Sequence, residues 1–400
     1  MATTAYPRIA IIGGGPGGLT LALTLHRRGV PFTVYERETS ADSRAHLGGM
    51  LDLGYESGQR ALRENGLGEV FARNSRPEAD SFRAYDPEGN LLFAKDPDPN
   101  QDPLDVRPEI DRSVLRKILV DAIPANAVKW SHALASVRDL GNGERELTFA
   151  NGNTAVVDIL VGADGANSRV RPLISSAVPI YHGVTGAEIS IAPEDTKKPE
   201  LQDVISMLGN GSMFSFGHGM MLGSQLNGDG RIRTYAWFPG PEDWKLPNEP
   251  AEARKVLLEI FKNRAPSLRK LIEYCDDGAI YQRSLYRLPL DHKWEHVPRV
   301  TILGDAAHLM SPAAGAGVNL AMLDALELGI VLADTINGAS TVEEREAAVA
   351  TWEKERIEAA NHFAVIANIN VQAWTSTEDP ASMLQSMFKR MGDSAVRRKA

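Results

Sequence analysis

A glycine-rich turn near the start of the chain constrains the fold more than any other feature. The segment "RIAIIGGGPGGLTLALTLHRRGVPFTVYER" (residues 8–37) places an apolar run over 9–12 before the turn. A helical stretch is expected over 19–28 and a second strand over 32–35. Short apolar runs of this kind are typical of buried strands in a parallel sheet. The segment therefore predicts a strand–turn–helix–strand unit.

The spacing of the glycines predicts dinucleotide binding. Gly13, Gly15 and Gly18 form G-x-G-x-x-G, in which the first permits a sharp turn, the second lets a pyrophosphate approach, and the third allows close helix packing. Glu36 lies 36 − 18 = 18 residues after the last glycine, where a carboxylate can accept hydrogen bonds from an adenosine ribose. The motif fits NAD and FAD alike. No second copy follows, because "GNGSMF" and "GHGMML" lack the last glycine, so a separate nicotinamide domain is not expected.

A second segment, "VTILGDAAHLMSPAAGAGVNLAMLDALELG" (residues 300–329), favours FAD. A strand over 300–303 would deliver Asp305 to the carboxyl edge of the sheet, where open α/β sheets bind ligands. The helix expected over 318–332 would begin with unpaired amide groups and a partial positive charge. Such a helix end, aimed at the flavin, would stabilise the reduced flavin anion. Gly315 and Gly317 would let the flavin ring pass close to the backbone.

A third segment is "VDILVGADGANSRVR" (residues 157–171). It predicts a strand over 158–162, a turn at Asp164 and Gly165, and a helix carrying Arg169 and Arg171. An Asp-Gly turn alone is a common feature and indicates little about function.

The three segments together resemble the single-component flavoprotein aromatic hydroxylases, the group of para-hydroxybenzoate hydroxylase. The likeness covers roughly residues 6 to 340. Within the group the chain is most similar to the tetracycline-inactivating monooxygenases, through "GGMLDL" (48–53), "RPEIDRSVLR" (107–116) and "GDAAHLM". The resemblance implies that Asp52 and Arg112 contact the cofactor and that Arg44 or a neighbour lies near the flavin or nicotinamide. The segments "TGAEISI" and "GNGSMF" differ from those enzymes, since they lack the expected Gln and Arg.

The motifs and the resemblance give one set of expected cofactor-binding residues. These are Gly13, Gly15, Gly17, Gly18, Glu36, Arg37, Arg44, Asp52, Arg112, Asp164, Asp305, Pro312, Gly315, Gly317, Val318 and Asn319. Two of them have plain structural alternatives: a surface ion pair for Arg112 and an N-terminal helix acid for Asp52. No residue is assigned a catalytic role: His308 and His46 could suggest acid–base chemistry, but His308 is interpreted as a packing residue or one that acts behind the flavin-binding Asp305.

The substrate side is expected in the middle of the chain. Short alternating runs over 178–276 predict antiparallel strands followed by a helical section over 251–274. Side chains that could face the flavin are Met213, Phe214, Phe216, Met221, Arg233, Tyr235 and Trp237, although an ordinary sheet face explains each of them too. Arg233 stands out, because a charge within "RIRTYAWF" needs solvent or an anionic partner.

The expected fold is α/β: a Rossmann-type FAD-binding domain with an inserted antiparallel-sheet substrate domain and a long C-terminal helix. The predicted boundaries are 1–75, 99–177 and 277–335 for the FAD-binding domain, 76–98 for an excursion toward the substrate domain, 178–276 for that domain, and 336–400 for the C-terminal helical segment. The long helix is expected over 342–373, where its apolar residues are interpreted as packing.

Composition limits the remaining function classes. The net charge of −9 argues against nucleic acid as a partner, and the basic tail "FKRMGDSAVRRKA" is interpreted as a solvated end. Cys275 is the single cysteine, which excludes an internal disulfide and a cysteine-rich metal site, and no metal is expected. No run reaches the roughly 18 apolar residues of a membrane span. A cytoplasmic monomer is therefore expected.

The sequence thus predicts an FAD-dependent monooxygenase. NADPH, or NADH, would reduce the flavin, and O2 would form a flavin peroxide that hydroxylates a phenolic, enolic or polycyclic aromatic molecule, polyketide-like substrates such as tetracyclines being candidates. The alternative is an FAD-dependent oxidase or dehydrogenase of the same fold that inserts no oxygen. Two further classes are a flavin-bound scaffold protein, against which the intact Gly315 and Gly317 argue, and a flavin-free NAD-binding module.

Overall fold

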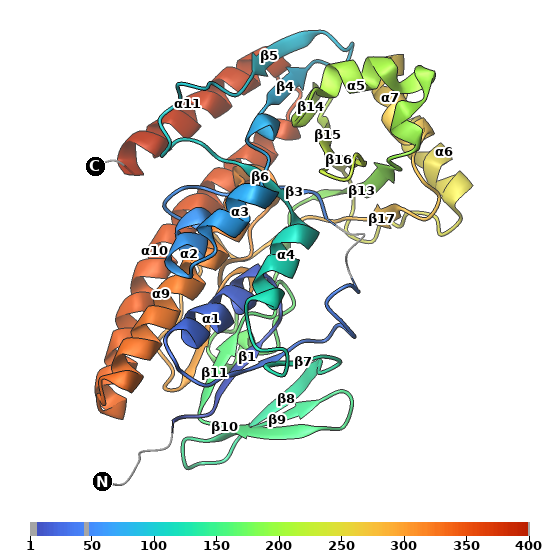
Figure 1. Cartoon of the computed structure of the whole chain (residues 1–400). Helices are drawn as coiled ribbons and strands as arrows, with labels where there is room; N and C mark the ends of the chain where they lie inside the picture. The colour runs from blue at the N-terminus through green and yellow to red at the C-terminus, as the bar shows by residue number, and fades with distance from the viewer. Residues whose placement is uncertain (1–5, 44–47, 399–400) are drawn as a thin grey trace.

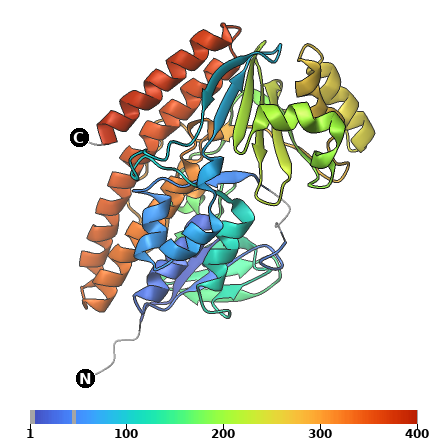
Figure 2. The same ribbon diagram turned by 45° about the horizontal axis from the view of Figure 1, so that its top comes forward.

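The computed structural model describes residues 6–43 and 48–398, with side chains up to residue 389. Two sheets lie at opposite ends of the molecule, and long helices run along one side of both (Figures 1 and 2). Each sheet with the elements packed on it is called a lobe below. This mixed α/β arrangement, with one parallel sheet, a larger mostly antiparallel sheet and a long C-terminal helix, confirms the predicted fold class.

The first sheet has five parallel strands in the order β19 (Val300–Ile302), β11 (Ile159–Gly162), β1 (Ile9–Ile12), β2 (Thr33–Tyr35) and β7 (Val128–Lys129). One face packs against α1 (Pro16–Arg27), α4 (Arg112–Asp121) and α9 (Gly317–Asn337). The other face packs against a three-stranded antiparallel sheet, β10 (Thr154–Val157), β9 (Arg145–Phe149) and β8 (Leu134–Asp139). Because both faces are covered, the central strands are apolar along their whole length.

Helices α1 and α9 pack unusually closely on this sheet. A Cβ atom on Gly329 would lie 2.4 Å from Thr24 Cγ2, and one on Gly17 would lie 2.7 Å from Leu303 Cδ1. Both glycines therefore bring α9 against α1 and β19. This contact fixes the start of α9 relative to the first glycine turn.

The second sheet has seven strands in the order β17 (Ile280–Gln282), β13 (Val184–Ile191), β16 (Ile232–Pro239), β15 (Met220–Leu226), β14 (Ser212–Gly217), β4 (Phe82–Tyr85) and β5 (Leu91–Lys95). All pairs are antiparallel except β14 with β4. Helices α5 (Gln202–Leu208), α6 (Pro250–Ile260) and α7 (Pro266–Glu273) cover one face. The segment 76–98 thus contributes two strands to this sheet.

The remaining elements connect the two sheets. Strands β3 (Met50–Asp52) and β6 (Glu109–Asp111) form an antiparallel ribbon that links the two sheets. Helices α2 (Gly58–Glu64) and α3 (Gly68–Asn74) follow β3 in the chain. A short ribbon pairs β12 (Ile180–Tyr181) with β18 (Tyr286–Arg287). Helix α8 (Asp305–His308) precedes α9, and α10 (Val342–Trp374) and α11 (Pro380–Arg398) end the chain. Helix α10 begins at a capping box, in which Thr341 and Glu344 satisfy each other's backbone amides.

Two local expectations need correction. The helix expected after Asp164 is absent: the segment forms a bend and one 3-10 turn, Arg171–Leu173. Side chains there compete for the backbone, since Asp164 accepts from the Arg169 amide and Ser168 accepts from the Val170 and Arg171 amides. The helical section expected over 251–274 is confirmed, and it consists of two helices, because Pro266 begins a new one.

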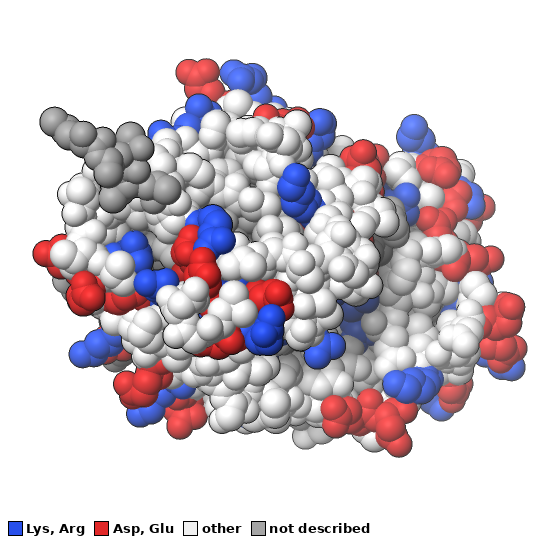
Figure 3. All heavy atoms as spheres, turned by 90° about the horizontal axis from the view of Figure 1, so that it is seen from below, with Lys and Arg blue, Asp and Glu red and all other residues white. Residues whose placement is uncertain are grey.

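The surface carries both signs of charge. On the face shown in Figure 3, basic and acidic side chains are intermingled rather than gathered into one broad patch. Within the described part of the chain, no helix combines the length and the apolar character needed to cross a bilayer.

Candidate cofactor and substrate site

The glycine turn after β1 is shaped for a ligand. Gly13 has φ +108°, and a Cβ there would lie 2.3 Å from the Ala163 carbonyl oxygen of the neighbouring strand end. A Cβ on Gly18 would lie 2.0 Å from the Gly13 carbonyl oxygen. Gly15 is different: it caps α1, and a Cβ on it would meet nothing within 4 Å. The turn is therefore closed around Gly13 and Gly18 but open at Gly15, where no side chain caps the helix amides.

Glu36 ends β2 beside this turn. Its buried carboxylate accepts hydrogen bonds from the Gly14 amide at 2.5 Å and from the Glu38 amide at 2.9 Å. Arg116 of α4 supports the same loop by donating to the Gly14 and Ala41 carbonyl oxygens. Arg37 points away and is exposed beside Glu38. Sequence reasoning missed Arg116, although its place in the "RPEIDRSVLR" helix was a usable signal.

Asp305 and Asp164 lie at neighbouring strand ends of the parallel sheet. Asp305 is exposed at the start of α8, and Gly304 before it has φ +59°. The buried Arg171 ties the two strand ends together: its guanidinium donates to the carbonyl oxygens of Asp305, Ala306 and Ala166. Arg171 is a second residue whose positioning role the sequence did not reveal, since its partners are backbone atoms far away in the chain.

The loop before α9 is held by α10. Asn370 donates to the Ala313 carbonyl oxygen at 2.8 Å, and Ser311 donates to the Ala367 carbonyl oxygen at 3.3 Å. Gly315 is exposed with φ +58°, and Pro312 is exposed beside it. No side chain caps the start of α9, and a Cβ on Gly317 would meet nothing within 4 Å. This helix end is therefore open in the same way as the start of α1.

Asn319 and Val318 begin α9, but their side chains differ in role. Val318 packs against the core, half-buried. The Asn319 side-chain oxygen accepts from the Gly54 amide, the Ser57 hydroxyl and the Gly58 amide, and its nitrogen donates to the Asp52 carbonyl oxygen. Asn319 thus anchors the segment that carries Asp52.

Asp52 lies near the start of α9, whereas Arg112 begins α4 directly after β6, the strand paired with β3. Arg107 bridges Asp52, at 2.6 Å between Nε and Oδ2, and the Gly315 carbonyl oxygen, at 3.4 Å. The exposed Arg112 side chain lies against Gly48, and its amide donates to the Gly49 carbonyl oxygen. Arg107 joins this group although the sequence did not single it out. Arg44 and His46 fall outside the described residues.

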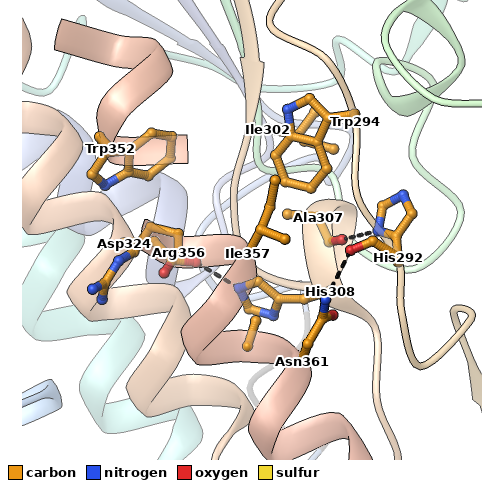
Figure 4. A pocket seen from close by; sticks show the side chains of 11 residues that line it. His292, Trp294, Ile302, Ala307, His308, Asp324, Trp352, Arg356, Ile357 and Asn361 are labelled. Atoms are coloured by element: carbon orange, nitrogen blue, oxygen red, sulfur yellow. Dashed lines mark hydrogen bonds and ion pairs between the residues drawn. The ribbon is translucent and has the colours of Figure 1, made fainter. Parts of the chain in front are cut away.

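A buried ion pair joins α8 to α9 (Figure 4). His308 Nε2 lies 2.6 Å from Asp324 Oδ2 of α9, and the Gly304 amide donates to the same oxygen at 3.2 Å. Burial alone would lower the pKa of His308, but the charge and hydrogen bond of Asp324 outweigh it and raise that pKa. A small cavity beside the pair is lined by residues of α10, including Trp352, Arg356 and Asn361. The pair fixes α8 on α9, in agreement with the packing role expected of His308.

The face of the seven-stranded sheet opposite α5, α6 and α7 is called the inner face below. Alternation along β14, β15 and β16 places Phe214, Phe216, Met221, Gln225, Arg233, Tyr235 and Trp237 on it, together with Glu188 of β13. Its apolar part packs against α10, α11 and Ala313 of the loop before α9. Met213 does not belong to this set: it lies on the opposite face, in the core formed with α5 and α7. The one-residue offset from Phe214 explains the difference.

The polar end of the inner face holds a buried charge cluster. Glu188 accepts from Arg233 Nη1 at 2.6 Å and from Arg283 Nε at 2.8 Å. The Glu188 and Arg233 side chains are 4% and 3% exposed. Burial raises the pKa of the neighbouring Tyr235, and the charge of Glu188 raises it further, so Tyr235 is a neutral phenol. The anionic partner that Arg233 requires is therefore supplied by the protein itself.

Comparison with known families gives a match over most of the chain. Residues 7–364 match the profile of the "FAD binding domain" family. Monooxygenase penA of Penicillium thymicola is 30% identical over 377 residues, which cover 82% of this chain and 85% of that protein.

Solved structures show the same fold. HpxO of Klebsiella pneumoniae, in complex with FAD and uric acid, superposes with a TM-score of 0.78 at 20% identity, over 96% of this chain and 92% of that one. Tetracycline destructase Tet(51) gives a TM-score of 0.72 at 19% identity, over 97% and 96%. At this identity the likeness concerns the fold.

Proposed function

The chain belongs to the FAD binding domain family and is an FAD-dependent monooxygenase, and we propose that NADPH, or NADH in its place, donates the electrons for hydroxylation of an electron-rich aromatic substrate. The substrate class proposed from the sequence, a phenolic, enolic or polycyclic aromatic molecule, fits the aromatic inner face. The assignments of individual cofactor-binding residues below are part of this proposal.

One observation carries the proposal: two uncapped helix starts open at the same edge of the parallel sheet. Helix α1 follows β1, and helix α9 follows β19 after α8 and a short loop. The free space beside Gly15 and Gly317 sets these two starts apart, since α2 to α8 lack a side-chain cap as well. Unpaired amide groups at a helix start attract negative charge. A long cofactor with a pyrophosphate near its middle and a flavin that becomes anionic on reduction fits this pair of sites.

The fit to FAD extends to the side chains. We assign the ribose to Glu36, the pyrophosphate to the Gly13–Gly18 turn, and the ribityl chain to Asp305, with Asp164 nearby. The start of α9, from Gly315 to Gly317, would meet the flavin, with Asp52 and Arg112 on the side of β3. Arg116, Arg171, Arg107 and Asn319 hold these segments in place through the hydrogen bonds described above.

When bound, FAD supplies the redox chemistry that activates O2. The protein's own contribution is positioning and electrostatics. The α9 start would favour the anionic reduced form, while the inner face and α10 would orient an aromatic ring and exclude water. No described side chain is needed as a proton donor or base in this scheme, which agrees with the packing role of His308.

The test is the visible spectrum of the purified protein under argon, recorded while NADPH or NADH is added with and without a panel of phenols and naphthols. We expect a yellow protein whose flavin is bleached faster in the presence of a panel member, and hydroxylated product once air is admitted. A flavin that ignores both nicotinamides, and is bleached only by a reduced substrate, would make the protein an oxidase or dehydrogenase instead. A protein that stays colourless after FAD is added would refute the assignment of both helix starts.

A further inference from the structure

The inner face changes character along its length. Glu188, Arg233 and Arg283 form its polar end, and Tyr235 follows as the cross-strand neighbour of Glu188. The Tyr235 ring stacks on Trp237, at 5.1 Å between ring centroids. Trp237 in turn lies parallel to Trp374 of α10, at 6.1 Å and an interplanar angle of 11°. A charge cluster therefore leads into a continuous row of aromatic rings.

We propose that this face selects uncharged, planar, multi-ring substrates that carry a carbonyl oxygen, and that Glu188 excludes aromatic carboxylates. This inference rests on the proposed function and narrows its substrate class. It assigns specificity to Glu188, Trp237 and Trp374.

The exclusion of carboxylates follows from the charge cluster. Both oxygens of Glu188 are engaged, one by Arg233 and one by Arg283, and the Gly48 amide lies 3.4 Å from the oxygen that Arg233 binds. An aromatic carboxylate directed at Arg233 would have to displace Glu188 or place a second negative charge beside it. The two arginines alone would attract such an anion, so its exclusion depends on Glu188, which engages both of them. Glu188 is 4% exposed, so solvent screens its repulsion of a second carboxylate only weakly. A site for benzoate-type acids would instead present an arginine without a carboxylate of its own.

The preference for a carbonyl follows from the indole groups. Trp237 and Trp374 are each 7% exposed, and neither Nε1 atom has a hydrogen-bond partner among the described residues. A buried N–H group without an acceptor is costly, and buried tryptophans usually find one. A planar ligand stacked along the row would bring its carbonyl oxygen to these donors while its rings add to the stacking.

A matched pair of ligands separates charge from shape: 3-hydroxy-2-naphthamide and 3-hydroxy-2-naphthoate. Their dissociation constants are measured on the FAD-loaded protein from the change in the flavin absorption spectrum, without turnover. We expect the wild type to bind the amide at least tenfold more tightly than the carboxylate. Equal binding, tighter binding of the carboxylate, or no spectral change with either ligand would overturn the proposal.

The variant Glu188→Gln removes the competing charge and keeps the shape. We expect it to bind the naphthoate at least tenfold more tightly than the wild type does, and the naphthamide within about threefold. Glu242→Gln is the matched control, since Glu242 is exposed on the lobe of the seven-stranded sheet. Among the described residues, its carboxylate accepts a hydrogen bond from the Tyr286 hydroxyl. An unchanged naphthoate affinity in a yellow, folded Glu188→Gln protein would refute the role of Glu188.

A second variant does not depend on the charge cluster. Trp237→Phe keeps a ring but removes the indole N–H, so naphthamide binding should weaken at least threefold while binding of 2-naphthol, which has no carbonyl, stays unchanged. Unchanged naphthamide binding would refute the carbonyl contact. Loss of the yellow colour in the wild type would instead refute the proposed function, so the two failures are distinguishable.

Discussion

At the scale of single residues, the site depends on polar side chains that hold backbone segments. Asn319 and Arg171 satisfy loops from different parts of the chain, and Glu36 accepts amides on both sides of the glycine turn. Each of these side chains replaces a regular secondary-structure contact that an irregular loop cannot make. Their substitution should therefore disturb the loops before it disturbs the sheets.

Asn319→Ala tests this idea. The change leaves two amides and a hydroxyl of segment 54–58 without their acceptor, so unfolding free energy should fall by about 3 kcal/mol. Affinity for FAD should fall at least tenfold, because the segment carrying Asp52 is released. Denaturant unfolding and FAD titration measure the two effects. Asn337→Ala, an exposed asparagine of the same helix, should change neither.

Glu109 allows a pH prediction. Burial, together with the charges of Asp52 and Asp80, raises the pKa of Glu109 well above its usual value. A carboxyl whose pKa is raised in the folded state contributes stability below its unfolded pKa of about 4.5, and this contribution is lost as pH rises through the folded pKa. Glu109→Gln cannot ionise, so its stability relative to wild type should increase between pH 5 and 8.

The measurement is denaturant unfolding across that pH range in the absence of FAD. Each unit of upward pKa shift corresponds to about 1.4 kcal/mol, so we expect a gain of at least that size at pH 8. Glu78→Gln, an exposed change two residues after Arg76, whose backbone pairs with that of Glu109, should show no such trend. Parallel pH curves for Glu109→Gln and wild type would contradict the prediction.

At the scale of secondary-structure elements, the proposed cofactor site rests on two helix starts. Helices α1 to α9 all begin without a side-chain cap, whereas α10 has a complete capping box at Thr341, and what distinguishes α1 and α9 is the free space beside Gly15 and Gly317 at their starts. Unsatisfied amides are costly unless something binds them, so helices left open at one sheet edge indicate a ligand site. The short helix α8 is fixed between them by the His308–Asp324 pair.

Gly15→Ala separates folding from binding at the α1 start. Gly15 has φ −80°, which alanine adopts without strain, and a Cβ there meets no protein atom within 4 Å. The free energy of unfolding without FAD should stay within about 1 kcal/mol of wild type. FAD affinity should fall at least tenfold, because the methyl group occupies the space of the pyrophosphate. Gly278→Ala, equally open but in the other lobe, is the control, and normal FAD binding by Gly15→Ala would refute the assignment.

Asp324→Asn tests the link between α8 and α9. Removing one member of a buried ion pair costs about 3–5 kcal/mol, which unfolding would detect. Because the pKa of His308 is raised, the pair's contribution is complete below about pH 6.5 and is lost as pH rises through the folded pKa. Wild-type stability should therefore decline more steeply above neutral pH than the stability of Asp324→Asn does, because the variant lacks the contribution of this pair. Asp334→Asn, an exposed change on the same helix, should preserve it.

At the scale of the whole molecule, the regions proposed for the cofactor and the substrate share one packed interface. The loop before α9 contributes Ala313 to the apolar cluster of the inner face, and α10 and α11 complete that cluster from the C-terminal end. Helix α10 packs beside α9 at the parallel sheet and continues to the end of the molecule that holds the seven-stranded sheet (Figure 1). Binding at the parallel sheet should therefore be felt in the seven-stranded sheet.

Thermal unfolding with and without FAD tests this coupling. A ligand at 100 times its dissociation constant stabilises the folded state by about 2.7 kcal/mol. We expect a single transition, observed by calorimetry and by tryptophan fluorescence, that shifts upward as a whole when FAD is added. Two transitions, of which FAD moves only one, would show that the lobes are energetically independent. The same preparation would test by gel filtration whether the protein is the monomer predicted from the sequence.

The sequence alone determined the parallel-sheet end of this protein. The glycine spacing, Glu36 and the "GDAAHLM" segment lie within short stretches, so local backbone requirements reveal them directly. The class of the second sheet was also predictable, because alternation along a strand is a local pattern. The domain boundaries and the individual site residues stay predictions.

The tertiary structure decided which residues meet across the chain. Met213 and Phe214 are both apolar, and the sequence predicted the same role for them. In the structure, alternation along β14 places Met213 against the helices and Phe214 on the inner face. Glu188 and Arg233 come from two strands and Arg283 from the loop after β17, and Trp374 comes from a helix about 140 residues beyond Trp237. Burial, charge pairing and stacking depend on these long-range contacts, which no local pattern encodes. The cofactor class was therefore readable from the sequence, whereas the chemistry of the substrate face depended on the fold.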